Sequence, residues 1–470
     1  MGERSGASKL STKDILYYVD EVPPLGESIL LGFQHVLTLF GATIAVPLIL
    51  GGAMGFSPDQ TAILIGAVMV TAGVATLLQI FFGTKLPIVQ SMSFSFIGPV
   101  LSIIKQTGGG VVSMQYVAGA VMSGSLIEIV VGWSGLIGKL RRFVTPVVIG
   151  PVIIMIGLSL FEVGAPKAGT HWPTALIVIV SIFLFSQVLS SRYRFFRLFP
   201  VLLAIIVGYA FCAVGTLTGI FPKGHPAYID FSLIAHSPWI RPIDKMIFPW
   251  GLPKFDLAFF LTILAGYLAS MIESFGDYFS CAYMSRASEP TSKVINRGIS
   301  MEGLGCFLSG IWGGFATTSY SENIGLIGLT KVASRYVVGV AAILLILLGV
   351  FNKFGACIAT IPEPVVGAMY CTVFGMISAI GVQQLTKVDM QSGRNLLIVG
   401  FTLFMALSFP AYIKGVPGLY NPSPINIGWA PWLANALNAI LSTEMAVAAI
   451  VGLTLDNVIP GTDKERGLCG

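Results

Sequence analysis

Long apolar runs recur along almost the whole chain, and they constrain the fold more than any other feature. Each run approaches the roughly 20 residues that a helix needs to cross the hydrocarbon of a bilayer. Helices are expected because no backbone group that faces lipid can go without a hydrogen bond. Bounded by Gly, Pro or charged residues, fourteen runs lie near 28–50, 61–82, 87–104, 111–136, 144–163, 174–190, 199–221, 256–284, 298–313, 319–330, 336–352, 362–381, 395–410 and 439–457.

Composition leaves little room for another kind of protein. Of the 470 residues, 55% are hydrophobic and only 10% are charged, against roughly 25% charged residues in a soluble domain. The mean hydropathy of the whole chain is +0.84. We therefore expect an all-α polytopic membrane protein with fourteen transmembrane segments and no large soluble domain.

The placement of Lys and Arg predicts the orientation in the membrane. If both termini are cytoplasmic, 19 of the 27 Lys and Arg residues fall on the cytoplasmic side, and half of the others lie in the long loop 222–255. Long loops inform the positive-inside rule less reliably. The rule thus supports an even number of spans with both termini in the cytoplasm, and we expect a multi-pass protein of the plasma membrane. The rule also explains the net charge of +5 without nucleic acid or another anionic partner.

Two of the fourteen runs are poor spanning helices because polar residues interrupt them. The third run contains Gln90, Ser91, Ser93 and Ser95, and the tenth contains Ser319, Ser321, Glu322 and Asn323. They take the third place in the first and in the second set of seven. Matched broken segments indicate an inverted-repeat transporter and its binding site, although two kinked helices are the alternative. We expect unwound or short extended backbone where the two segments cross.

Ionisable residues inside these runs are costly and indicate function. Glu273 and Asp277 are four residues apart, so they lie on one face of the eighth run. Two carboxylates this close favour the binding of a proton by one of them, which suits a group that takes up and releases a proton. Alternatively, Asp277 only orients its neighbours through hydrogen bonds.

Four further residues belong to the predicted site. Glu322 lies in the broken tenth run, Glu302 lies in the ninth, and His35 follows Gln34 in the first. Glu302 is partly solvated if it lies near the cytoplasmic end, and His35 is equally a core residue. Glu128 and Glu162 are isolated in the sequence, and we leave both out of the predicted site.

The broken runs and the carboxylates together suit a planar heterocycle with alternating N–H and C=O groups. Glu273 and Glu322 would accept hydrogen bonds from the ring. Backbone N–H groups near Phe94 and Ser321 would donate, because broken helices expose the positive end of a dipole. The ring of Phe94 would stack on the ligand.

Two other classes of function remain as alternatives. An anion exchanger or channel would favour Lys or Arg in the broken runs, where this chain has carboxylates. A membrane hydrolase would need a nucleophile or a metal set, and the sequence has no HExxH, no GxSxG and only four His. The six cysteines show no CxxC spacing. We predict no catalytic residues, no metal site and no cofactor.

One motif in the tenth run resembles the signature of a known family. Glu322-Asn323-Ile324-Gly325 is followed by four residues and then Thr330-Lys331. This pattern is similar to that of the nucleobase-ascorbate transporter family, also called nucleobase:cation symporter-2 or xanthine/uracil permeases. The resemblance covers nearly the whole chain through Gln34-His35, Phe40-Gly41-Ala42-Thr43, Gln90 to Phe96, Glu273 to Tyr278, and Asp456 to Thr462.

The resemblance implies two inverted repeats of seven segments, with short strands in segments 3 and 10. After a cytoplasmic tail, 1–27, it implies a core domain from 28–136 (segments 1–4) and 256–352 (segments 8–11). The gate domain would comprise 137–255 (segments 5–7) and 353–470 (segments 12–14 with the C-terminal tail). It further implies a homodimer through the gate domain and elevator-like movement of the core, driven by symport of H⁺ or Na⁺.

The resemblance also assigns residues and a substrate. Substrate would be held by Glu273, Glu322, Phe94, Ser93 and Ser321, and the coupling or organising residues would be Asp277, Glu302, His35, Gln34, Asn323 and Gln90. Animal ascorbate carriers of the family have Pro where this chain has Glu322, which favours import of a nucleobase over ascorbate. Asp277 resembles purine carriers, so xanthine or urate is favoured over uracil. Glu302 departs from the Asp of many purine carriers, and Na⁺ coupling stays open.

Overall fold

The computed structural model describes residues 15–136, 143–159, 161–193, 196, 199–416, 421–428, 434, 437, 438 and 440–467. The predicted tail is therefore described only from residue 15, and residues 137–142 of the predicted gate domain lie outside the described residues.

The first half of the chain forms α1 (Leu25–Ala53), α2 (Pro58–Phe81), β1 (Gln90–Met92), η1 (Phe94–Phe96), α3 (Ile97–Thr107), α4 (Gly110–Trp133), α6 (Pro146–Leu158), α7 (Phe161–Ala168), η3 (Gly169–His171), α8 (Trp172–Phe183), η4 (Leu184–Val188), η5 (Leu189–Ser191) and α10 (Pro200–Leu217).

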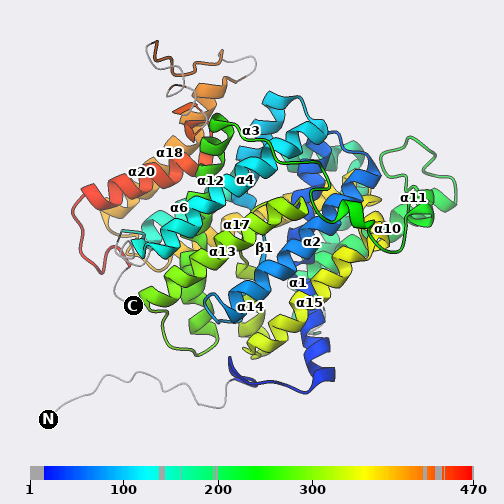
Figure 1. Cartoon of the computed structure of the whole chain (residues 1–470), viewed down its shortest axis with the longest axis horizontal. Helices are drawn as coiled ribbons and strands as arrows, with labels where there is room; N and C mark the ends of the chain where they lie inside the picture. Colours follow the sequence, from blue (N-terminus) through cyan, green and yellow to red (C-terminus); the bar gives the residue numbers. More distant parts are fainter. Residues whose placement is uncertain are drawn as a thin grey trace.

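The second half repeats the pattern of long helices around one short strand (Figure 1). It begins with two short helices in the long loop after α10, which the sequence did not indicate. The elements are α11 (Phe231–His236), η6 (Ile243–Lys245), α12 (Leu257–Met284), α13 (Ser292–Trp312), β2 (Thr317–Ser319), α14 (Ser321–Thr330), α15 (Arg335–Val350), α16 (Asn352–Ala359), α17 (Glu363–Leu385), α18 (Gly393–Lys414) and α20 (Glu444–Val458).

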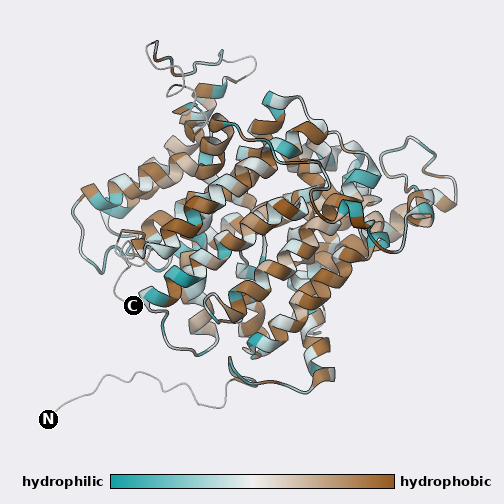
Figure 2. Cartoon of the chain, viewed as in Figure 1, coloured by the Kyte–Doolittle hydropathy of each residue, from teal (hydrophilic) through white to brown (hydrophobic). Residues whose placement is uncertain are grey.

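Eight helical stretches among the described residues are long and apolar enough to cross a membrane. Hydrophobic residues run along the helices and onto the outside of the bundle (Figure 2), where Leu217 and Phe404 are 76% and 66% exposed. Such an exposed apolar surface suits lipid rather than water. The prediction of a polytopic α-helical membrane protein is confirmed. The count of fourteen spans stays a prediction, because several segments are short or broken.

Several helices begin at residues whose side chains bind free backbone N–H groups. Ser57 and Gln60 form a reciprocal capping box at the start of α2. Asp256 accepts from the N–H groups of Ala258 and Phe259 at the start of α12. Such caps satisfy N–H groups that have no partner inside the helix. They fix where α2 and α12 begin, and α12 carries much of the predicted site.

Helices α2 and α15 approach closely where two glycines face each other. A Cβ atom added to Gly349 would lie 2.5 Å from the carbonyl oxygen of Gly66, and one added to Gly66 would lie 2.7 Å from that of Gly349. Small residues permit such backbone contact between membrane helices, where dispersion forces drive the packing. The two repeats are thus joined by an interface that has no space for side chains at these positions.

We expect Gly349→Ala to separate α2 from α15 and to destabilise the protein by about 1–3 kcal/mol, the usual cost of overpacking. Thermal unfolding in detergent measures the effect. The control is Gly375→Ala on α17, where an added Cβ meets nothing within 4 Å. That variant should be as stable as the original or more so, because Ala favours a helix by up to about 1 kcal/mol over Gly. Equal melting temperatures for both variants would contradict the close contact.

Candidate functional site

The two broken segments meet as a pair of short antiparallel strands inside the helix bundle. β1 pairs with β2 in the register Gln90 with Ser319, Ser91 with Thr318 and Met92 with Thr317. The six paired residues are all buried. The predicted extended backbone in segments 3 and 10 is therefore confirmed, and the chain is not a continuous helix through Phe94 or Ser321.

A helix follows each strand and begins beside the strand pair. After β1, the short helix η1 leads into α3, and after β2 the chain enters α14 directly at Ser321. The first turn of a helix leaves N–H groups without intrahelical partners and carries a partial positive charge. The strand pair thus places two helix starts in the interior of the protein, which is the arrangement that the matched polar interruptions predicted.

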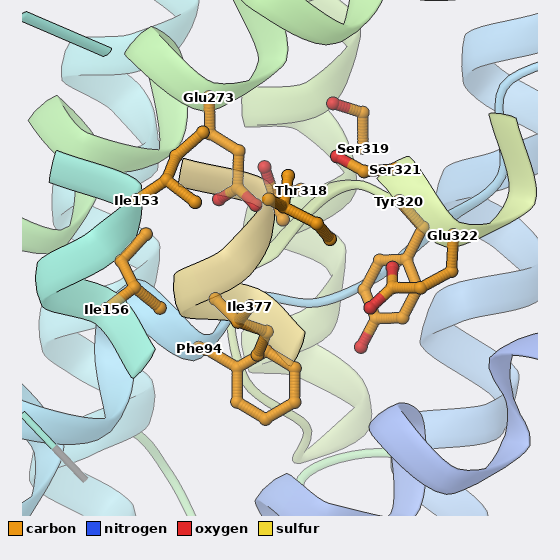
Figure 3. A pocket seen from close by; sticks show the side chains of 11 residues that line it. Phe94, Ile153, Ile156, Glu273, Thr318, Ser319, Tyr320, Ser321, Glu322 and Ile377 are labelled. Atoms are coloured by element: carbon orange, nitrogen blue, oxygen red, sulfur yellow. The ribbon is translucent and has the colours of Figure 1, made fainter. Parts of the chain in front are cut away.

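A cavity lies at this point, and its lining residues come from both halves of the chain. Figure 3 shows side chains from several segments converging on it. One side of the cavity is formed by Phe94, by Glu273 on α12, by the end of β2 and by the start of α14. The other side is formed by isoleucines. The lining residues are Phe94, Ile153, Ile156, Glu273, Thr318, Ser319, Tyr320, Ser321, Glu322, Ile377 and Ile380.

Glu273 and Glu322 both line the cavity, as predicted, and come from different segments. In Figure 3 the Glu273 side chain reaches toward Thr318, whereas Glu322 lies across the cavity beside Tyr320. Both residues are half-buried, so their carboxylates keep access to the cavity. Of the other residues predicted to contact substrate, Phe94 and Ser321 also line the cavity.

Ser93 lies just behind the cavity and does not line it. Its side chain is 1% exposed, and its hydroxyl oxygen accepts a hydrogen bond of 3.3 Å from the backbone N–H of Ser95. Ser93 therefore shapes the turn between β1 and α3, and the structure does not bring its side chain to the other four residues.

Asp277 holds the end of β2 and the start of α14. The hydroxyl groups of Ser319 and Ser321 donate to its two carboxylate oxygens over 3.0 and 2.7 Å. The Asp277 side chain is buried and does not line the cavity. Its contacts are those of an organising residue, since it fixes two residues that do line the cavity.

Glu302 lies in the middle of α13 and is 1% exposed, so the structure excludes the partly solvated alternative. Its carboxylate accepts hydrogen bonds from donors on two other segments, α12 and β1. These are Ser270 (3.2 Å), Ser274 (2.8 and 2.7 Å), Tyr278 (3.2 Å) and the amide of Gln90 (3.4 Å). Glu302 thereby joins α12, α13 and β1 behind the strand pair.

His35 and Asn323 connect α1 to α14. The Asn323 amide lies 3.1 Å from the imidazole Nδ1 of His35 and donates over 3.1 Å to its carbonyl oxygen. His35 is 2% exposed, and neither residue lines the cavity. Gln34 is half-buried, its carbonyl accepts from the Thr38 hydroxyl over 2.9 Å, and its side chain does not line the cavity either.

Sequence reasoning missed the apolar side of the cavity. Ile153 and Ile156 come from α6, and Ile377 and Ile380 come from α17. All four lie in apolar runs whose sequence predicts a membrane-spanning helix and nothing more, so no local pattern indicates that these isoleucines line a cavity. Phe374 on α17 also contacts Phe94, with ring centroids 5.8 Å apart in an edge-to-face arrangement. Thr318 and Tyr320 flank the predicted residues and could have been found from the break itself.

The structure corrects one prediction about a carboxylate outside this cavity. Glu128 seemed isolated in the sequence, yet it is fully buried in α4 and interacts electrostatically with Glu302. The two residues are 174 positions apart in the chain, and only the packing of α4 on α13 brings them together. The Glu162 side chain, which also seemed isolated, lies outside the described residues.

The paired strands, two internal helix starts and a polar cavity within an apolar bundle define a membrane transporter with discontinuous helices. The model of the permease family that includes xanthine and uracil permeases matches residues 26–415. The chain belongs to this family, the nucleobase-ascorbate transporters. It is a transporter of a small molecule across a lipid bilayer and not an enzyme.

Several curated relatives match almost the whole chain. Solute carrier family 23 member 2 of Mus musculus is 37% identical over 99% of this chain and 78% of its own length. Solute carrier family 23 member 1 of the same organism is 38% identical over 97% and 82%. Nucleobase-ascorbate transporter 2 of Arabidopsis thaliana is 34% identical over 96% of this chain and 90% of its own length.

Solved structures share the fold at low sequence identity. The transmembrane domain of the cyanobacterial bicarbonate transporter BicA matches with a TM-score of 0.54 and 15% identity, over 93% of this chain and 99% of that domain. The murine solute carrier 26 family member A9 anion transporter, in its inward-facing state, matches with a TM-score of 0.60 and 10% identity, over 93% and 69%. These likenesses concern the fold alone.

Proposed function

We propose that this transporter imports a nucleobase across the plasma membrane together with a cation, and that purines such as xanthine or urate are preferred over uracil. The observation that carries the proposal is that Glu273 and Glu322 both open onto one cavity at the start of α14. Ring N–H groups of a nucleobase donate to the carboxylates, and ring carbonyls accept from N–H groups at the helix start. Phe94 supplies an aromatic face for stacking.

The position of the cavity supports an elevator-type mechanism. Glu273, Glu322 and the strand pair belong to the proposed core domain (28–136 and 256–352). The four isoleucines belong to the proposed gate domain (137–255 and 353–470). A polar site on one domain that faces an apolar surface on the other lets the core carry the substrate past the gate. In this proposal the gate domains of two copies form a homodimer, and both termini are cytoplasmic.

Two alternatives differ in the chemistry of the substrate. Ascorbate appears in the name of the Arabidopsis relatives, but an anion at neutral pH would face two carboxylates in this cavity. The structural neighbours named as bicarbonate and anion transporters suggest an anion substrate, yet the lining residues include no Lys or Arg. Electrostatic repulsion therefore favours a neutral heterocycle over either anion, and among the proposed purines it favours xanthine over urate, which is a monoanion at neutral pH.

Uptake into liposomes that contain the purified protein tests the proposal. Labelled xanthine, urate, uracil and ascorbate are offered in turn, with an inward H⁺ gradient, an inward Na⁺ gradient or neither. We expect accumulation of a purine that requires one of the two gradients. Accumulation of ascorbate alone would select the first alternative, and exchange of anions without either gradient would select the second.

A further inference from the structure

A buried carboxyl group lies outside the cavity and has no part in the function proposed so far. Glu128 is in the C-terminal part of α4, a helix that packs against α13. It is fully buried, and neither of its carboxylate oxygens has a hydrogen-bond partner within the described part of the chain. A buried carboxylate in that situation is costly unless it carries a proton.

Among the described residues, the groups that interact with Glu128 carry no positive charge. Glu302 and Cys306 face it from α13, and Tyr267 and Tyr278 interact with it from α12. Both tyrosine hydroxyls are engaged elsewhere. Tyr267 donates to the carbonyl of Val121 over 2.8 Å, and Tyr278 donates to Glu302 over 3.2 Å. The Cys306 thiol is directed to the carbonyl of Thr317 at 3.3 Å.

Glu302 differs from Glu128 in its hydrogen bonds. Donors from Ser270, Ser274, Tyr278 and Gln90 surround the Glu302 carboxylate, which stabilises its charged form. Two adjacent negative charges in a low-dielectric interior are unfavourable. The arrangement therefore accommodates one charge, on Glu302, and one proton, on Glu128.

We propose that Glu128 and Glu302 form a proton-binding pair inside the core, and that its single proton is the cation coupled to substrate transport. The two carboxyl groups are not hydrogen-bonded to each other in this structure, so the transfer step requires α4 and α13 to bring them within hydrogen-bond distance; the O–H bond on Glu128 then breaks and a new O–H bond forms on Glu302. Glu128 becomes the carboxylate, Glu302 becomes the neutral acid, and the total charge of the pair is unchanged. The coupling role rests on the proposed function, whereas the existence of the pair does not.

Hydrogen bonds connect this pair to the substrate cavity. Ser274, which donates to Glu302, also lies 3.0 Å from the hydroxyl of Thr318 and 2.8 Å from that of Ser319. Both of those residues line the cavity. A proton arriving on Glu302 weakens its bond with Ser274 and frees that hydroxyl for the end of β2. The position of the proton, on Glu128 or on Glu302, is thereby linked to the geometry of the substrate site.

Infrared spectroscopy of the purified protein tests the pair without any transport. Glu128→Gln keeps the size of the side chain but cannot bind the proton. We expect it to remove one carboxylic-acid C=O band that shifts on transfer to D₂O. Glu363→Gln, at an exposed position beside Lys167, should leave that band in place. If Glu128→Gln does not fold, Glu128→Met should give the same loss. A spectrum of either Glu128 variant identical to the original overturns the pair.

Transport measurements test the coupling role. One coupled proton allows about tenfold accumulation for each unit of pH gradient, since one unit corresponds to about 1.36 kcal/mol. Glu128→Gln should lose this accumulation, while exchange of labelled for unlabelled nucleobase without a gradient falls far less. The coupling role is overturned if Glu128→Gln accumulates nucleobase as the original protein does. It is also overturned if the original protein responds only to a Na⁺ gradient. If the original protein moves no nucleobase, the proposed function fails, and the infrared comparison still decides the pair.

Discussion

Glu273→Gln and Glu322→Gln each weaken nucleobase binding by about ten- to a hundredfold. Glutamine keeps the volume of the side chain but replaces half of its acceptor capacity with a donor. A hydrogen bond to a charged group contributes about 1.5–3 kcal/mol, and every 1.4 kcal/mol is about a factor of ten in affinity. Both carboxylates line the cavity, so the loss should appear at either position.

Calorimetry on the purified variants measures this loss. Expression and stability in detergent should change little, because a charge inside the membrane is itself costly and its removal seldom destabilises a helix. The matched control is Glu363→Gln, whose carboxylate is 61% exposed and lies outside the cavity. Glu128→Gln cannot serve as a control, because Glu128 interacts electrostatically with Glu302. Unchanged affinity in both cavity variants would mean that the substrate binds elsewhere.

The sequence predicted the part of the site that carries polar residues at membrane depth. Glu273 and Glu322 are expensive inside a bilayer, and the breaks at Gln90 and Ser319 stand out against apolar surroundings. In the structure Gln90 pairs with Ser319 in the strand register, and the carboxylates of Glu273 and Glu322 line one cavity. Local signals sufficed because each residue is unusual in its own segment.

The remaining part depends on contacts between distant segments, which hydropathy does not encode. Glu128 and Glu162 seemed equally isolated, yet the packing of α4 on α13 brings Glu128 to Glu302. The isoleucines of α6 and α17 resemble lipid-facing residues in every local property. Only the tertiary arrangement directs Ile377 into the cavity and leaves Val382, on the same helix, 56% exposed.

The same packing separates residues that line the cavity from residues that organise it. Asp277 is four residues from Glu273 on the same helix face, and the sequence left it as either a partner in proton binding or a residue that orients its neighbours. In the structure Asp277 accepts hydrogen bonds from Ser319 and Ser321. A shared helix face indicates only the direction of a side chain, and the hydroxyl donors from β2 and α14 were not foreseeable from α12. The roles of both residues in coupling stay predictions.

Ile377→Trp abolishes nucleobase binding if the substrate lies between the two proposed domains. Ile377 is 7% exposed and lines the cavity opposite the strand pair. Tryptophan places a bulky indole ring on the apolar side of the cavity, and the packed side chains around it leave no free volume to accommodate the ring. We expect the affinity to fall by at least about a hundredfold, or about 2.8 kcal/mol.

Calorimetry and thermal unfolding are measured on the same preparation, so that a loss of binding is not mistaken for a loss of fold. Val382→Trp on the same helix is the matched control, because its side chain points out of the bundle and is 56% exposed. That variant should bind as the original does. The comparison isolates the apolar side of the cavity, since Ile377 makes no hydrogen bond that the substitution could remove. Normal affinity in Ile377→Trp would show that substrate contacts the polar side alone, and the elevator-type mechanism would lose the surface on which it depends.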